Sequence, residues 1–172
     1  MVDVQNDFCP GGALAVTDGD AVVEPINRLA AGSPFVVATR DWHPADHESF
    51  AENGGVWPVH CLQDSAGAAL HSGVDRAHID VIVDKGKARE LEGYSGFEDT
   101  ELERLLRDHD VDTVHVAGLA LDYCVKATAL DAKRAGFDVI VHRDATRAVD
   151  VVPGDGDRAV EELRAAGVKV VD

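Results

Sequence analysis

Apolar runs alternate with amphipathic stretches along most of this chain. Strands are predicted where the runs are short and nearly continuous, at Met1–Asp3, Phe35–Thr39, Val81–Val83, Thr113–Ala117, Asp138–His142 and Val168–Val171. Helices are predicted where apolar residues recur with helical spacing, at Ala21–Ala31, Thr100–Asp108, Asp122–Ala135 and Asp157–Ala166. Because apolar strands between amphipathic helices are typical of a parallel sheet covered on both faces, we expect one doubly wound α/β domain over residues 1–172.

The predicted first strand is unusually short. Only two residues precede Asp3, whereas strands in globular proteins run about 5 residues. A central strand is part of the core. We therefore expect either an exceptionally short first strand or a start of the sequence that has been trimmed or misassigned.

Length and composition limit the classes of protein to consider. A chain of 172 residues can bury a substantial core. No run approaches the about 18 apolar residues of a membrane-spanning helix, and no signal-peptide pattern opens the sequence. The three cysteines, Cys9, Cys61 and Cys124, are too few and odd in number for a disulfide framework. We expect a cytoplasmic protein with no membrane partner.

The chain is strongly acidic, with 32 acidic against 16 basic residues and a net charge of −16. A nucleic-acid-binding protein needs a basic patch, and none is visible, so we expect no nucleic-acid partner. Aspartate carries most of the excess, with 22 residues, while lysine occurs five times. Highly charged surfaces suit proteins that work in high salt, so we expect either a halophilic source or an ordinary acidic bacterial enzyme.

Salt dependence separates these two sources. If the acidic excess is a halophilic adaptation, the melting temperature should rise from dilute buffer into molar KCl, because screening shortens from about 10 Å at 0.1 M to about 3 Å at 1 M. Thermal unfolding across a KCl series measures this. A melting temperature that stays constant or falls with added KCl would exclude the halophilic source and favour an ordinary acidic bacterial enzyme.

Cys124 carries the strongest chemical signal. It follows the apolar run at Thr113–Ala117 and lies near the start of the helix predicted at Asp122–Ala135. A cysteine at the amino end of a helix meets the positive end of the helix dipole, which lowers the thiol pKa and favours a nucleophilic thiolate. The alternative is a buried free cysteine with no chemical role.

Two charged residues also lie at the ends of predicted strands, Asp3 at the first and Lys85 just past the third. In the commonest doubly wound order the first and fourth strands are neighbours, so Asp3 and Cys124 would face each other across the switch point. The carboxylate could take the thiol proton, and Lys85 could hold both partners in ionised form. A solvated surface lysine is the alternative for Lys85. For Asp7 we favour a turn or capping role.

The long polar segment at residues 40–78 holds a carboxylate and several imidazoles, those of Asp41, His43, His47 and His60. Loops of this length between strands are usually functional or disordered. Asp41 and His43 are two residues apart, so in extended backbone their side chains project to one side. Such a set suits zinc, iron or manganese, and solvated surface histidines are the alternative.

Five segments carry a family resemblance in their order and spacing, Asp3–Phe8, Thr39–Pro44, Trp57–Cys61, Tyr94–Phe97 and Gly118–Val125. Together they resemble the motifs of the nicotinamidases, also known as pyrazinamidases, within the isochorismatase-like cysteine hydrolases. The resemblance spans essentially the whole chain. Its metal motif and Trp57–Cys61 separate nicotinamidases from metal-free relatives.

The resemblance implies a three-layer fold with six parallel strands and helices on both faces. It implies a catalytic triad of Asp3, Lys85 and Cys124. It also implies a cis peptide bond between Leu119 and Ala120, which directs the Ala120 amide, with that of Cys124, into an oxyanion hole.

The resemblance further implies one divalent metal ion, zinc first and iron or manganese as alternatives, which binds the pyridine nitrogen of the substrate. The implied ligands are Asp41, His43 and His60, while ligation by His47 stays open. The implied substrate-binding residues are Phe8, Trp57, Tyr94 and Ala120. Leu121 and Tyr123 fall at variable positions, and we expect neither to matter.

The implied activity is hydrolysis of nicotinamide to nicotinic acid and ammonia through a thioester, as part of NAD salvage. One alternative is a related hydrolase that acts on another amide or an enol ether. The other is an inactive, metal-binding family member, against which the intact triad argues. The sequence leaves the oligomeric state open, a homo-oligomer included.

Overall fold

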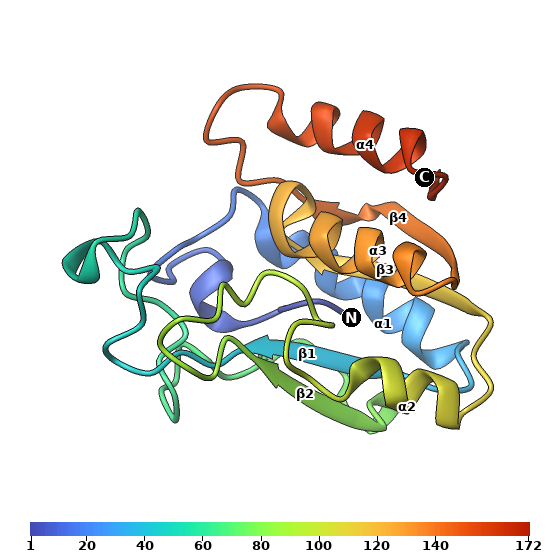
Figure 1. The fold of residues 1–172 in the computed structure, drawn as a ribbon, viewed down its shortest axis with the longest axis horizontal. Coiled ribbons are helices and arrows are strands. Elements are labelled where there is room, and N and C mark those ends of the chain that lie inside the picture. Colours follow the sequence, from blue (N-terminus) through green and yellow to red (C-terminus); the bar gives the residue numbers. More distant parts are fainter.

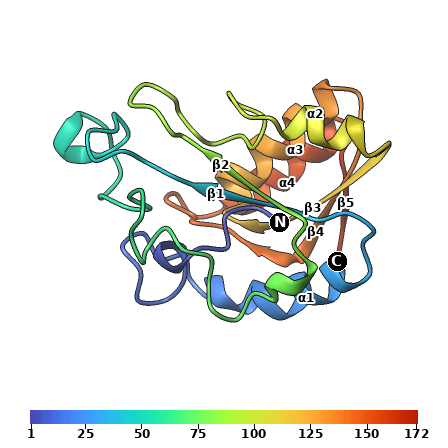
Figure 2. The same cartoon turned by 90° about the horizontal axis from the view of Figure 1, so that it is seen from below.

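A computed structural model describes residues 1–172 as three layers with a parallel β-sheet in the middle (Figures 1 and 2). The strands are β1 (Val37–Asp41), β2 (Val81–Lys85), β3 (Thr113–Leu119), β4 (Asp138–Arg147) and β5 (Lys169–Val171). The α-helices are α1 (Val23–Ala31), α2 (Leu102–Asp108), α3 (Lys126–Arg134) and α4 (Asp155–Ala165). Short 3₁₀-helices lie at Asn6–Phe8, Gly19–Val22, Ala51–Asn53 and Arg76–His78, and a π-helix at Leu121–Val125 leads into α3. No helix is both long enough and apolar enough to cross a membrane.

The structure has five strands rather than the six expected, in a two-stranded and a three-stranded part. β1 pairs with β2, β3 with β4, and β4 with β5, all in parallel. In place of a first strand, Val2 alone forms parallel bridges to Thr39 of β1 and to Gly118 of β3. The spatial order is therefore β2, β1, Val2, β3, β4, β5. The segment that carries Asp3 lies between β1 and β3, as the doubly wound order predicted.

Gly118 permits the close approach of the Val2 segment to β3. Its φ angle is +133°, and a Cβ atom there would lie 1.9 Å from the carbonyl oxygen of Val2. That oxygen accepts a hydrogen bond from the Leu119 amide at 2.9 Å. Any side chain at position 118 would therefore push the segment carrying Asp3 away from the sheet.

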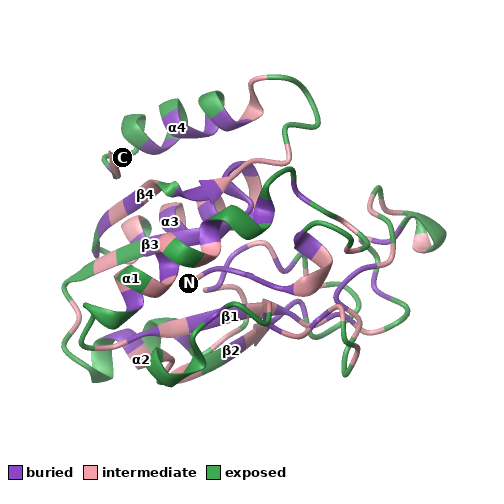
Figure 3. Ribbon diagram, turned by 180° about the vertical axis from the view of Figure 1, so that it is seen from behind, coloured by how far each residue is buried: buried purple, intermediate pink, exposed green.

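The apolar faces of the helices close the core on both sides of the sheet (Figures 2 and 3). One cluster joins α2, α3 and α4 to one face, with Leu106, Ala129 and Leu163 packed among strand valines. On the other face α1 contributes Ile26, which packs in a cluster with Leu119. Burying a leucine, isoleucine or valine side chain contributes about 1.5–3 kcal/mol. The helical spacing of these apolar residues therefore decides which face of each helix packs against the sheet.

Helix boundaries follow the sequence less closely than helix positions do. The sequence predicted a helix that begins at Thr100. The helix begins instead at Leu102, and Thr100 contributes by accepting the Leu102 amide on its hydroxyl at 3.1 Å. Past α3 and α4, Gly136 and Gly167 take positive φ angles of +93° and +81°, the left-handed geometry that ends helices.

A cavity of about 450 Å³ lies between β1 and β3, next to Met1. Apolar side chains line most of it, among them Val37, Val114, Leu29 of α1 and Leu106 of α2. Neither the candidate nucleophile nor a candidate metal ligand borders it, so its size does not mark the site of the chemistry.

Candidate active site

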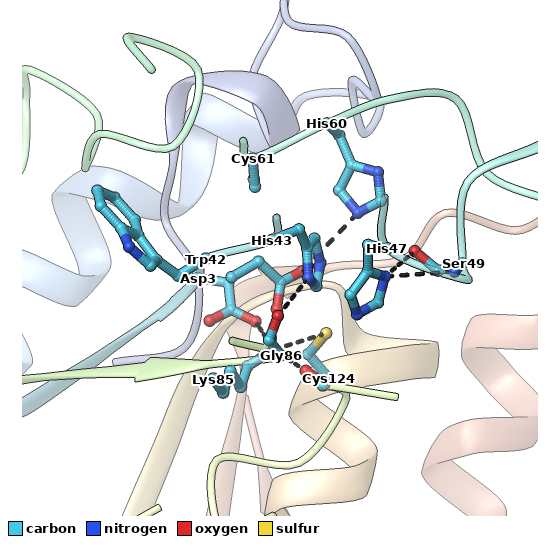
Figure 4. Close-up of polar contacts among 12 residues, drawn as sticks. Asp3, Trp42, His43, His47, Ser49, His60, Cys61, Lys85, Gly86 and Cys124 are labelled. Atoms are coloured by element: carbon cyan, nitrogen blue, oxygen red, sulfur yellow. Dashed lines mark hydrogen bonds and ion pairs between the residues drawn. The ribbon is translucent and has the colours of Figure 1, made fainter. Parts of the chain in front are cut away.

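The carboxyl ends of three neighbouring strands bring the candidate residues together. Asp41 is the last residue of β1 and Lys85 the last of β2, and the parallel register pairs them directly. Cys124 lies in the π-helix that follows β3. Asp3 reaches the same place because its segment runs between β1 and β3. All four side chains are buried, and Figure 4 shows those of Asp3, Lys85 and Cys124 close together.

Lys85 is the centre of this cluster. Its Nζ lies 2.8 Å from Oδ2 of Asp3 and 3.5 Å from Sγ of Cys124, and it also contacts Oδ1 of Asp41 and the carbonyl oxygen of Gly93. The side chain is fully buried. Burial opposes its charge, but Asp3 and Asp41 outweigh burial and raise the pKa of Lys85 well above its usual value. The ammonium group therefore stays charged.

Asp3 has the properties of a proton acceptor. Its backbone takes the left-handed conformation, with φ of +48°, and the Thr39 hydroxyl donates to its Oδ1 at 2.6 Å. Burial raises the pKa of Asp3, with Lys85 opposing and Asp41 adding to the rise. A carboxylate with a raised pKa is a stronger base. Oxygens of Asp3 and Asp41 and the Cys124 sulfur all lie within 4.8 Å of one another.

The expected lowering of the Cys124 pKa is wrong. Burial raises the pKa of this thiol well above its usual value, and the nearby Asp3 and Asp41 add to the rise, while Lys85 only partly offsets it. The position of Cys124 at the start of a helix can be inferred from the sequence, whereas the burial of its thiol cannot. The resting residue is therefore a thiol, and the neighbouring Asp3 must take its proton before attack.

Asp41, His43 and His60 form a group able to hold a metal ion, with one ligand atom from each inside a 4.8 Å span. The Nε2 atoms of His43 and His60 lie 3.5 and 3.9 Å from Oδ2 of Asp41. Their Nδ1 atoms pair with the carbonyl oxygens of Gly86 and Pro58, at 3.0 and 2.8 Å. In metal sites, the histidine ring nitrogen that does not bind the metal commonly donates to a backbone carbonyl oxygen. The three side chains therefore fit a divalent cation.

The pKa shifts of Asp41 and His60 favour the protonation states that bind a cation. Burial alone would raise the pKa of Asp41, but Lys85 and His43 outweigh it and hold the pKa well below its usual range. Burial lowers the pKa of His60 and so favours the neutral imidazole. An ionised carboxylate and a neutral imidazole are the forms that bind metals.

His47, whose ligation the sequence left open, packs against the group but uses both ring nitrogens elsewhere. Nδ1 lies 2.7 Å from the Ser49 hydroxyl and Nε2 lies 2.8 Å from the Leu91 carbonyl oxygen. Its ring centre is 4.0 Å from that of His43. In this arrangement His47 supports the His43 ring and offers no free nitrogen.

The predicted pocket residues line one small cavity beside Cys124. Phe8, Trp57, Tyr94 and Ala120 all border it, together with the metal-type group. The Trp57 indole donates to the Tyr94 hydroxyl at 3.0 Å. The peptide bond between Leu119 and Ala120 is cis, as the resemblance implied.

Tyr123, which we expected not to matter, lies at the site. It borders the same cavity, and its ring lies edge-on to Trp57 at 5.1 Å and tilted to Tyr94 at 5.6 Å. An aromatic residue one position before a candidate nucleophile was the available signal. The cavity also receives Leu14, Ser49, Glu92 and Val149, which no motif singled out.

Asp7 does more than the local turn or cap assigned to it. Its carboxylate accepts the Ala13 amide at 3.2 Å, which is a local contact, and the Cys61 amide at 2.7 Å, across 54 residues of sequence. It thereby joins the segment carrying Phe8 to the segment carrying His60. Only the second contact was unforeseeable, because it depends on how the long segment folds back.

Comparisons with known proteins agree with this geometry. The isochorismatase domain model matches residues 1–172. The nicotinamidase of Escherichia coli K12 is 43% identical over 192 residues, which cover 97% of this chain and 90% of that protein. The crystal structure of pyrazinamidase of Pyrococcus horikoshii in complex with zinc is 45% identical with a TM-score of 0.93, covering 100% of this chain and 96% of the other. That of PnC1 from L. infantum in complex with nicotinate is 40% identical with a TM-score of 0.96, covering 100% and 90%. This chain therefore belongs to the isochorismatase family.

Proposed function

We propose that this protein is a metal-assisted cysteine amidohydrolase that converts nicotinamide to nicotinic acid and ammonia, a reaction of NAD salvage. The observation that carries the proposal is that Asp3 and Lys85 converge on Cys124, which borders a cavity also lined by the metal-type group of Asp41, His43 and His60. Relatives with nicotinamidase activity, and one solved in complex with nicotinate, support the substrate.

In the first step Asp3 removes the proton from the Cys124 thiol, and the sulfur attacks the carboxamide carbon of the substrate. The resting protonation states suit this order, since burial raises the pKa of both groups. Lys85 lies within 3.5 Å of the sulfur and stabilises the negative charge that forms as the proton leaves.

In the second step the tetrahedral intermediate collapses. The backbone amides of Ala120 and Cys124 stabilise its oxyanion, a contribution that in other acyl-transfer enzymes reaches about 3 kcal/mol per donor. Asp3 returns its proton to the nitrogen that leaves as ammonia. Water then attacks the thioester, Asp3 takes up the water proton, and nicotinic acid is released from Cys124.

Asp41, His43 and His60 would hold the divalent metal, and zinc is our choice because the relative from Pyrococcus horikoshii was solved with zinc. The bound ion would bind the pyridine nitrogen and so fix the ring. Phe8, Trp57 and Tyr94 would pack against the faces and edges of that ring. The metal would therefore serve to bind the substrate, and the covalent chemistry belongs to Cys124.

Removing the metal should raise the KM for nicotinamide more than it lowers the melting temperature, because the ion holds substrate and not the core. The protein is dialysed against chelator and assayed before and after zinc is restored. His60→Ala tests the metal group more specifically than Asp41→Ala does, because Asp41 also contacts Lys85. Chelated protein that unfolds outright would instead indicate a structural metal.

Substrate choice tests the proposed activity. Zinc-loaded protein should release ammonia from nicotinamide and hardly at all from benzamide, which has the same shape but lacks the ring nitrogen. Ammonia release is measured by a coupled assay at matched concentrations. Equal rates for the two amides, or no release from nicotinamide, would favour a related hydrolase with another substrate.

A further inference from the structure

Gln5 is fully buried beside the active site and takes no part in the chemistry described above. Its side-chain amide is saturated by backbone groups. Oε1 accepts the Asp41 amide at 2.8 Å, while Nε2 donates to the carbonyl oxygens of Asp41 and Ala68, each at 2.8 Å. One side chain therefore holds both polar groups of the Asp41 backbone.

The reason for this contact lies in the sheet. At Thr39 the open side of β1 is covered by backbone, since the Thr39 amide donates to Met1 at 2.9 Å and its carbonyl accepts the Asp3 amide at 3.2 Å. The chain then turns away at Asp3, where φ is +48°. Two residues further along β1, Asp41 has no backbone neighbour from this segment, and the amide of Gln5 takes that place. A primary amide suits the position because it presents a donor and an acceptor as a peptide unit does.

The Asp41 backbone sets the direction of the Asp41 carboxylate, whose two oxygens contact different groups. Oδ1 contacts Lys85, while Oδ2 faces the imidazoles of His43 and His60. A small rotation of the Asp41 peptide would move both oxygens together. Whatever fixes that peptide therefore fixes the metal group and its spacing from the triad.

We propose that Gln5 is a positioning residue, which clasps the backbone of Asp41 and thereby sets the geometry and affinity of the metal group. The inference rests on the proposed function for the metal's role. It concerns how this chain's own residues hold the site, and it can be tested without turnover.

The test compares metal binding by the parent protein and two variants. Gln5→Met keeps the length of the side chain and removes all three hydrogen bonds. Gln5→Glu keeps an acceptor for the Asp41 amide. It replaces the Nε2 donor with a carboxylate oxygen, which repels the carbonyl oxygens of Asp41 and Ala68. Asn27→Asp is the matched control, because the Asn27 side chain donates to the Gly73 carbonyl oxygen and accepts the Asp75 amide, at a half-buried position on α1.

Zinc affinity, measured by competition with a chromogenic chelator, should fall about 10–100-fold in Gln5→Met, the usual effect of losing an outer contact to a metal ligand. The fall should be smaller but clear in Gln5→Glu and absent in Asn27→Asp. The visible absorption spectrum of bound Co²⁺ should change shape in the Gln5 variants, because the ligand geometry changes. The KM for nicotinamide should rise more than kcat falls.

The outcomes separate the two proposals. If either Gln5 variant folds and binds zinc and Co²⁺ as the parent does, the positioning role is wrong. If Gln5→Met does not fold, Gln5→Glu decides by the same measurements. If the parent binds metal with the expected dependence on Gln5 but does not hydrolyse nicotinamide, the proposed function fails and the positioning role stands.

Discussion

Cys124→Ala should lower kcat for nicotinamide by more than about 10⁴-fold while the protein stays folded, because removal of a covalent nucleophile eliminates the thioester pathway. The side chain is small and its loss leaves little space in the core, so thermal unfolding should change little. Steady-state ammonia release and circular dichroism measure the two effects.

Cys9→Ala is the matched control for this change. Cys9 is also buried, and burial raises the pKa of its thiol to about 11, but it does not border the active-site cavity. The control should keep nearly full activity. If Cys124→Ala keeps more than a small fraction of the parent rate, the cysteine mechanism is wrong.

Lys85→Met should be the most destabilising single change in the site, by about 3–5 kcal/mol, because it leaves Asp3 and Asp41 as buried carboxylates with no cation. Methionine keeps much of the length of the lysine stem. Urea unfolding of the parent and the variant at pH 8 measures the difference, and activity should be lost as well.

The destabilisation should depend on pH with a definite sign. In the parent, Lys85 lowers the pKa of both Asp3 and Asp41. Without it the folded pKa of Asp41 rises above the unfolded value, and that of Asp3, already raised by burial, rises further. The folded state then binds more protons and gains stability as pH falls. The difference from the parent should therefore shrink from pH 8 to pH 5.

Lys126→Met gives the surface comparison for Lys85. Lys126 pairs with Glu162 at 2.9 Å, with the side chains 26% and 57% exposed. Its loss should cost less than about 1 kcal/mol at either pH. Equal effects of the two lysine substitutions would mean that the buried charge network does not carry the stability assigned to it.

The sequence predicted the parts of this molecule that periodicity and topology control. Apolar runs located β1 to β5, and the doubly wound order placed Asp3 opposite Cys124, because parallel strands deliver their carboxyl ends to one edge of the sheet. The sixth strand was the exception, since Val2 alone stands in its place. The two-residue spacing of Asp41 and His43 predicted that their side chains project to the same side of the chain. The family resemblance added His60 as the third metal ligand.

What the sequence could not predict depends on burial and on contacts across long separations. The raised pKa of Cys124 comes from desolvation, which no local pattern encodes. The contact of Asp41 with Lys85 joins the metal group to the triad, and it appears only when β1 and β2 pair in register. The contacts of Gln5 with Asp41 and of Asp7 with Cys61 span 36 and 54 residues. Such contacts follow from the fold and cannot precede it.

The most direct test of the central claim, a thioester on Cys124, is partitioning by hydroxylamine. Nicotinamide and methyl nicotinate would form the same acyl-enzyme, which water converts to nicotinic acid and hydroxylamine to nicotinohydroxamic acid. At each hydroxylamine concentration the ratio of the two products, measured by chromatography, should be the same for both substrates. Absence of the hydroxamic acid, or ratios that differ between the amide and the ester, would contradict a common intermediate on Cys124.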